Sequence, residues 1–123
     1  MKIKKIQMDA LSEKHCVPCQ GGILPMKRQE INGYLRDLNG WHVIENHHIR
    51  KVYTFADFNS SLAFVNKVGM LAEEENHHPN ICFTWGKVEI TIWTHKINGL
   101  HENDFILAAK TEKIYNTSLD AGN

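Results

Sequence analysis

Apolar residues recur every three or four positions in three stretches of the chain, which is the period of a helix with one buried face. The longest stretch begins after Asp57, a residue type that caps helix N-termini, and ends near Asn76, before the helix-breaking Pro79. Its apolar stripe consists of Phe58, Leu62, Val65, Val68 and Leu71 with Ala72. The spacing predicts helices over residues 27–38, 58–76 and 102–116.

Four shorter stretches are rich in β-branched and aromatic residues and are bounded by turn residues, as strands are. They cover residues 41–44, 49–55, 81–85 and 88–94. In the last stretch Val88, Ile90 and Ile92 alternate with more polar or bulkier neighbours, so one face is aliphatic and the other is mixed. Turns at 46–48 and 86–87 join the four strands into two hairpins.

The resulting order is helix, strand, strand, helix, strand, strand, helix. Two hairpins interleaved with helices indicate the α+β class, with a four-stranded antiparallel sheet and three helices packed on one face. The length of 123 residues suits one core. We therefore expect an extended N-terminal segment over residues 1–26, one domain over 27–118 and a C-terminal tail over 119–123.

Composition and charge exclude several classes of protein. The apolar fraction of 42% is ordinary, and the 14 basic residues balance the 14 acidic ones, so no basic surface for nucleic acid is expected. No apolar run approaches the roughly 20 residues that span a bilayer, and the first residues lack the apolar centre of an export signal. We expect a cytoplasmic protein, whose three cysteines are free thiols.

Eight histidines are the unusual feature of the composition, and four of them, including His77, His78 and His95, lie between residues 73 and 104. Glu73 and His77 are four apart near a helix end, which places them on one face, and His78 follows before the break at Pro79. His95 ends the second hairpin, so it can meet the histidine pair at the end of the sheet. Converging imidazoles beside a carboxylate suit a reaction that needs an acid and a base near neutral pH.

Each of these features also has a structural explanation when it is taken alone. A histidine pair at a helix C-terminus is favoured by the helix dipole, and a carboxylate such as Asp104 is favoured in the first turn of a helix. The acidic run 73–75 is typical of a solvated face. Only the joint occurrence of these residues, in this order, favours a shared site.

That joint pattern resembles the pterin-4a-carbinolamine dehydratases over roughly residues 27–118. The matching positions are Glu73, His77, His78, Pro79, Trp85, His95 and Asp104, together with Gly40-Trp41 and Gly99-Leu100. Two departures are visible. His101 stands where the family commonly has a threonine N-cap, so the last helix is expected to fray at its start. Trp93 is bulkier than the mammalian residue, which would narrow one wall of the pocket.

The resemblance implies that the protein removes water from a 4a-hydroxytetrahydropterin to give quinonoid dihydropterin in tetrahydropterin recycling, without a metal or another cofactor. The implied catalytic residues are His77, His78, His95 and Glu73. The implied substrate-binding residues are Asn76, Trp93, Thr94, Lys96 and Asp104. In this scheme His78 and His95 share the acid and base roles, His77 positions the substrate, and Glu73 orients His77.

The sequence also leads to expectations about partners and about alternative functions. The resemblance implies a homodimer or homotetramer, with the apolar face of the last helix or a sheet edge as the contact, and an aromatic amino-acid hydroxylase as a protein partner. An alternative is a non-catalytic dimerisation module, because mammalian members bind a homeodomain transcription factor. A third possibility is half of a zinc site formed by His15, Cys16 and Cys19.

Overall fold

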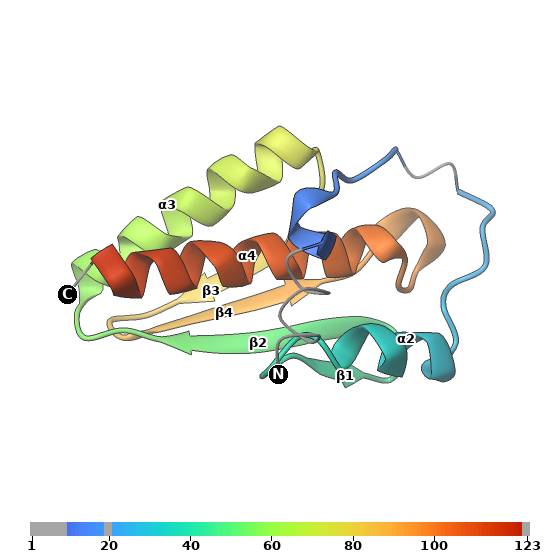
Figure 1. The fold of residues 1–123 in the computed structure, drawn as a ribbon, viewed down its shortest axis with the longest axis horizontal. Coiled ribbons are helices and arrows are strands. Elements are labelled where there is room, and N and C mark those ends of the chain that lie inside the picture. Colours follow the sequence, from blue (N-terminus) through green and yellow to red (C-terminus); the bar gives the residue numbers. More distant parts are fainter. Residues whose placement is uncertain (1–9, 19–20, 122–123) are drawn as a thin grey trace.

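A computed structural model describes residues 10–18 and 21–121 of the chain and contains an open four-stranded antiparallel sheet in the order β1-β2-β4-β3. The predicted α+β class, the order of elements and the packing of helices on one face are confirmed (Figure 1). The elements are α2 (Arg28–Leu35), β1 (His42–Ile44), β2 (His48–Thr54), α3 (Phe58–Glu75), β3 (Asn80–Phe83), β4 (Lys87–Ile92), the 3-10 helix η1 (His95–Ile97) and α4 (Glu102–Ala121).

The centre of the sheet is the pairing of β2 with β4, which joins the two hairpins. Ile90 and Ile92 of β4 and Ile49 of β2 are fully buried on the face that the helices cover. Each such side chain contributes about 1.5–3 kcal/mol through burial. The alternating residues point to the uncovered face, where Val52 is 45% exposed. The alternation of residue types in the sequence of these strands therefore matches the alternation of buried and exposed side chains.

Both ends of α3 are fixed by local contacts. At its start the side chain of Asp57 accepts a hydrogen bond from the backbone N–H of Ser60 at 2.8 Å, which confirms the predicted N-cap and lowers the pKa of the Asp57 carboxyl. At its end Asn76 adopts a left-handed conformation with φ 51°. Asn tolerates this conformation, and Pro79 prevents further helix. The histidine pair 77–78 therefore lies just beyond the helix, not on it.

The two ends of the chain differ from the expectation. Residues 10–13 are helical, so the predicted extended segment over 1–26 is wrong there, while residues 1–9 and 19–20 lie outside the described part. Helix α4 continues to Ala121, so the predicted end at residue 116 and the tail from 119 are wrong as far as residue 121. No glycine or proline occurs between residue 102 and Gly122, so nothing in the sequence stops this helix earlier.

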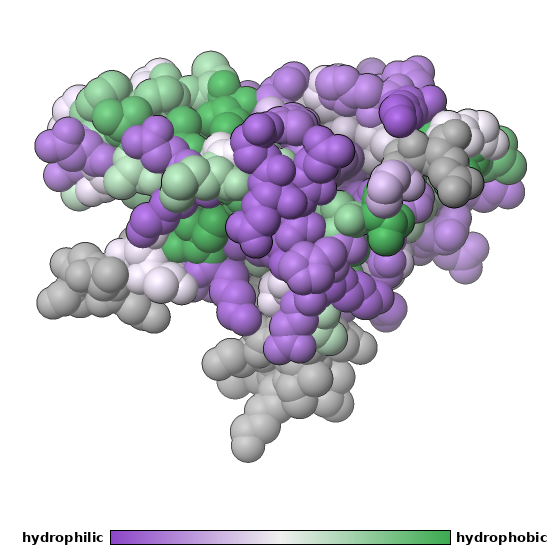
Figure 2. Space-filling view, turned by 90° about the horizontal axis from the view of Figure 1, so that it is seen from above, coloured by the Kyte–Doolittle hydropathy of each residue, from purple (hydrophilic) through white to green (hydrophobic). Residues whose placement is uncertain are grey.

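The exposed apolar surface lies on α3 rather than on α4. Phe58, Leu62 and Met70 of α3 are 44%, 37% and 67% exposed, and Figure 2 shows hydrophobic residues gathered over one end of the molecule. Phe105 and Ile106 of α4 are buried in the core instead. These side chains of the last helix belong to the core of the chain itself, and the contact between copies, through that helix or a sheet edge, stays a prediction. Within the described residues, no helix is both long and apolar enough to cross a membrane.

Candidate active site

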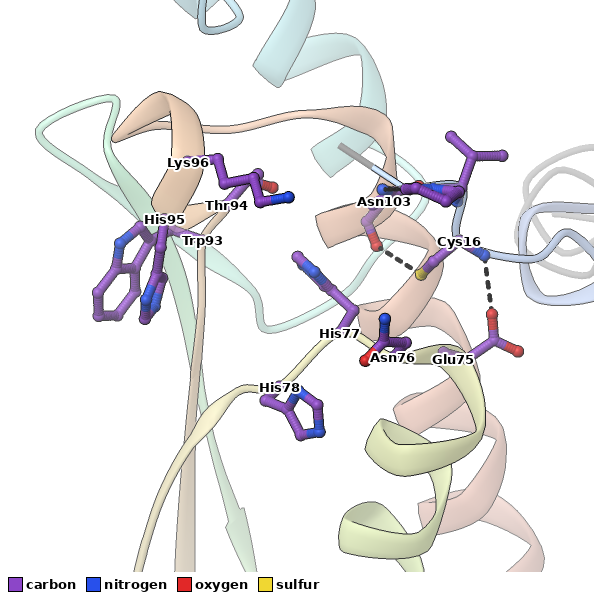
Figure 3. Close-up of a pocket in the computed structure, with 12 residues that line it drawn as sticks. Cys16, Glu75, Asn76, His77, His78, Trp93, Thr94, His95, Lys96 and Asn103 are labelled. Carbon is purple, nitrogen blue, oxygen red and sulfur yellow. Dashed lines mark hydrogen bonds between the residues drawn. The ribbon is translucent and has the colours of Figure 1, made fainter. Parts of the chain in front are cut away.

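A pocket of about 380 Å³ lies where the end of α3, the β4–η1 junction, the start of α4 and the N-terminal segment meet (Figure 3). It unites most of the residues expected from the sequence, although they are far apart in the chain. Those that line it are Asn76, His77, His78, Trp93, Thr94, His95 and Lys96. The two remaining candidates, Glu73 and Asp104, act on this lining through hydrogen bonds to His78 and His77.

His77 is held by a buried carboxylate. Its Nε2 lies 2.6 Å from Oδ1 of Asp104, a residue with no exposed surface. The same carboxylate accepts hydrogen bonds from the hydroxyl of Thr94 at 2.8 Å and from the backbone N–H of His101 at 2.9 Å. Because an ionised carboxylate only accepts, His77 donates from Nε2, and a neutral ring keeps its lone pair on Nδ1. The tautomer and the direction of His77 are thus set by Asp104.

Glu73 contacts the other histidine of the pair. Its Oε2 lies 2.5 Å from Nε2 of His78, so the prediction that Glu73 orients His77 is wrong. The four-residue spacing rule applies inside a helix, and α3 ends at Glu75 before either histidine. The side chains of His78 and Glu73 are 55% and 78% exposed, so water screens this pair, unlike the buried pair beneath His77.

His95 and Trp93 form the aromatic side of the pocket. Their rings stack with centroids 4.4 Å apart and planes 23° apart. Both residues follow β4, which ends at Ile92, because the chain turns into η1 and returns through a bridge between Thr94 and Gly99. Trp93 also lies 5.3 Å from the ring of His47, between the pocket and the uncovered face of the sheet. The strand predicted to reach residue 94 therefore ends two residues earlier.

Sequence reasoning missed the wall formed by Cys16, Val17 and Pro18, and the Glu75 and Asn103 side chains that hold it. The carboxylate of Glu75 accepts the backbone N–H of Cys16 at 2.7 Å and contacts Nδ1 of His15 at 2.9 Å.

A signal for Glu75 is nevertheless present in the sequence. Val68, Ala72 and Glu75 fall at i, i+4 and i+7, which is the buried stripe of α3. The interpretation of the whole acidic run as a solvated face is therefore wrong at this residue.

Burial governs the ionisation of this wall. It raises the pKa of the Cys16 thiol to about 12, and the carboxylates of Glu75 and Asp104 act in the same direction. For Glu75 burial also raises the pKa, but the hydrogen bonds from Cys16 and His15 and the charge of Lys110 outweigh it, so the pKa is lowered. The pocket therefore has a neutral thiol beside an ionised, fully bonded carboxylate at neutral pH.

These contacts bear on the zinc interpretation of His15, Cys16 and Cys19. Cys19 lies outside the described residues, and the other two side chains are engaged with Glu75 and Asn103. Zinc is bound by a thiolate, whereas the raised pKa favours a protonated Cys16. Over residues 10–18 and 21–121, no group of three or more His, Cys, Asp or Glu side chains is arranged to hold a metal ion.

The histidine at the start of α4 caps the helix after all. The ring Nδ1 of His101 accepts the backbone N–H of Asn103 at 3.1 Å, and Asp104 accepts the backbone N–H of His101. This reciprocal arrangement is similar to a capping box, except that the imidazole accepts the N–H of the second residue of the helix rather than of the third. The expected fraying has no structural basis here, and the same carboxylate serves both the helix start and His77.

The structure is an α+β domain with an open antiparallel sheet and helices on one face of that sheet. A histidine-lined pocket lies at one end of the sheet. The chain belongs to the pterin 4 alpha carbinolamine dehydratase family, whose model matches residues 24–114.

Two bacterial relatives carry the provisional name pterin-4-alpha-carbinolamine dehydratase. The protein of Rubrobacter xylanophilus is 53% identical over 107 residues, which is 87% of this chain and 100% of the relative. That of Rickettsia canadensis is 53% identical over 106 residues, which is 85% of this chain and 97% of the relative. The crystal structure of a transcriptional coactivator/pterin dehydratase from Brucella melitensis aligns with a TM-score of 0.71 and 30% identity, over 74% of this chain and 98% of that one.

Proposed function

We propose that this protein dehydrates a 4a-hydroxytetrahydropterin to quinonoid dihydropterin, as part of tetrahydropterin recycling. The observation that carries the proposal is the pocket itself, where His77, His78 and His95 line one cavity and a buried carboxylate sets the direction of His77. A volume of about 380 Å³ is at the small end of ligand sites and suits a bicyclic ring with a short substituent.

The reaction needs one acid and one base, and it leaves the total number of protons on the enzyme unchanged. The acid donates a proton to the hydroxyl on C4a, the C4a–O bond breaks and water leaves. The base takes the proton from N5, and the electrons of that N–H bond form the C4a=N5 double bond. One proton enters and one leaves, so no external oxidant or reductant is required. Each positioned transfer is worth about 10²–10⁴-fold in rate.

Differences in burial support a division of roles among the histidines. The side chain of His77 is only 14% exposed and is fixed by Asp104, which suits a group that positions or polarises the carbinolamine. His78 and His95 are less enclosed and can exchange protons with water, as the acid and the base must do between turnovers. We assign these two roles jointly to His78 and His95.

The remaining lining residues have binding roles in this proposal. The flat stack of Trp93 on His95 offers a face for the pterin ring. Asn76 and Lys96 supply polar groups at the mouth of the pocket. The hydroxyl of Thr94 donates to Asp104, so Thr94 contributes by supporting the carboxylate beneath His77. Glu73 acts on His78.

The test is replacement of His77, His78 and His95 singly by alanine, with formation of quinonoid dihydropterin followed by absorbance. We expect each variant to lose about 10²–10⁴-fold in kcat/KM. His42→Ala is the matched control, because His42 is an exposed histidine on the edge strand β1, away from the pocket lining. Near wild-type rates in all three pocket variants would contradict the mechanism.

A second candidate function is a protein-binding role, which is favoured by the similarity to the Brucella melitensis protein, described as a transcriptional coactivator/pterin dehydratase. The two functions separate in a variant in which all three pocket histidines are alanine. In a host that lacks the gene, rescue by this inactive variant would support binding, and failure of rescue would support catalysis. Homodimer or homotetramer formation stays a prediction, which sedimentation measures.

A further inference from the structure

One wall of the pocket comes from the N-terminal segment, before residue 24, where the match to the family begins. Residues 16–18 supply this wall. In Figure 3 Cys16 and Asn103 lie on one side of the pocket, Trp93 and His95 lie on the other, and His77 stands between them. A ligand against the aromatic stack is therefore bounded on its far side by residues 16–18.

The backbone of this wall is fixed by two buried side chains. Asn103, 2% exposed, accepts the N–H of Val17 at 3.0 Å and donates its amide to the carbonyl of Val17 at 2.6 Å. Glu75, whose side chain is 2% exposed, accepts the N–H of Cys16 at 2.7 Å. Moving the segment would leave these groups buried without partners, which is unfavourable. The wall is thus part of the folded pocket.

The side chain of Val17 is free to vary without disturbing that attachment. It is a pocket-lining residue that is 58% exposed, and Asn103 holds it through backbone atoms alone. Val17 and Pro18 present apolar surface, and the Cys16 thiol between them and Glu75 is uncharged at neutral pH. This side of the pocket suits a short uncharged substituent and is unsuited to a long or anionic one.

We propose that residues 16–18 are a specificity wall that limits the substituent carried by the pterin ring, and that the side chain of Val17 sets the limit. This inference rests on the proposed function and deepens it by restricting the substrate class to pterins with a short neutral side chain. Glu75 and Asn103 are positioning residues, because they act through the backbone of the wall.

The first test changes the size of the wall. Val17→Trp should weaken binding of 7,8-dihydrobiopterin, with its three-carbon side chain, by about tenfold, and binding of 6-methyl-7,8-dihydropterin by less than about twofold. Val17→Ala should improve binding of pterins with longer side chains. The matched control is Leu24→Trp, which adds the same ring at a residue that is 82% exposed and outside the pocket. Calorimetric titration gives the affinities without turnover.

The second test loosens the attachment. Asn103→Ala should shrink the difference in affinity between the two dihydropterins, and should speed amide hydrogen exchange at Val17 and Cys16. Asn103→Asp keeps an acceptor for the N–H of Val17, so it should restore part of that protection. Exchange that is unchanged in Asn103→Ala would overturn the proposed attachment.

The outcomes separate this inference from the proposed function. Equal weakening of both dihydropterins by Val17→Trp, or no weakening of either, overturns the specificity wall even if the wild-type protein turns over carbinolamine. Size discrimination in a protein with no dehydratase activity supports the wall and contradicts the proposed function. A wild-type protein that binds neither dihydropterin overturns both.

Discussion

The chain contains two adjacent histidine pairs, and they lie in contrasting surroundings. His47 and His48, at the β1–β2 turn, face each other with their Nδ1 atoms 3.0 Å apart, and His47 also contacts the side-chain oxygen of Asn98 at 2.8 Å. In the second pair each ring has a carboxylate, Asp104 for His77 and Glu73 for His78. The same dipeptide thus forms two different electrostatic arrangements.

The partners explain what each arrangement can do. At His48 burial, the charge of His47 and the charge of Arg50 lower the pKa, so a ring that faces another ring tends to stay neutral. A ring that faces a carboxylate has a defined tautomer and direction, which acid–base chemistry requires. The carboxylate, and not the His-His dipeptide, therefore distinguishes the proposed catalytic pair from the structural one.

Among the variants that test the contrast between the two histidine pairs, Asp104→Asn is expected to have the largest effect on stability and activity. The amide would turn an N–H₂ group toward Thr94, His101 or His77, which are all donors to Asp104. The free energy of unfolding should fall by about 2–4 kcal/mol, and kcat/KM should fall by about 10²-fold or more. Urea denaturation and steady-state rates measure the two effects. Wild-type stability would contradict the role given to this carboxylate.

The structural pair provides the comparison for that result. Replacing His47 and His48 together by glutamine should change kcat/KM by less than about threefold, because among the described residues neither ring lines the pocket and neither is hydrogen-bonded to a carboxylate. A loss as large as that of Asp104→Asn would remove the distinction between the two pairs.

A smaller effect is expected from Glu73→Gln. Exposed ion pairs contribute about 0–1 kcal/mol, so loss of the charge beside His78 should lower kcat by no more than about fivefold. High salt should reduce the difference between variant and wild type. The adjacent Glu74→Gln is the matched control, since Glu74 is also an exposed glutamate and does not line the pocket. Equal effects of the two variants on kcat would mean that Glu73 has no specific role in the site.

The smallest effect concerns pH and stability at His48. Its pKa in the folded protein lies below the ordinary value of 6.5, so the unfolded chain binds more protons as the pH falls. The corresponding stability is complete above about pH 6.5 and is lost below it. His48→Gln should therefore lose less stability than wild type between pH 7 and pH 5, as urea midpoints at the two pH values measure. If the stability of His48→Gln and of wild type changed equally with pH, the lowered pKa of His48 would be contradicted.

The fold can be predicted because its strong signals are local. The cap at Asp57 and the alternation in β4 each occur within a few residues, and each is confirmed. The predicted core stripe of α3 is only partly right, because Val68 and Ala72 are buried whereas Phe58 and Leu62 are exposed. Errors arise where tertiary contacts decide. Leu38 is buried although α2 ends at Leu35, so its apolar character reports burial and not helix. The central pairing of β2 with β4 has no local signal, and two predicted hairpins leave it open.

The sequence predicts which histidines and neighbouring residues gather at the pocket, but neither their pairings nor the N-terminal wall. Spacing along α3 assigns Glu73 to His77, whereas the left-handed turn at Asn76 redirects the chain and leaves His77 to a carboxylate 27 residues away. The wall at residues 16–18 cannot be found from spacing, because its attachment to Asn103 spans 86 residues. Long-range polar contacts of this kind depend on the finished packing of α4 against the N-terminal segment.

In the proposed mechanism, Asp104 makes the integrity of one helix end a condition for catalysis. Its carboxylate closes the first turn of α4 and holds the ring of His77 at the same time. A molecule in which only that turn has unwound would retain its sheet and most of its core, yet it would have lost the acceptor that aims the imidazole. During gradual denaturation, enzymatic inactivation should therefore precede the collapse of secondary structure, and catalysis becomes a sensitive reporter of local unfolding.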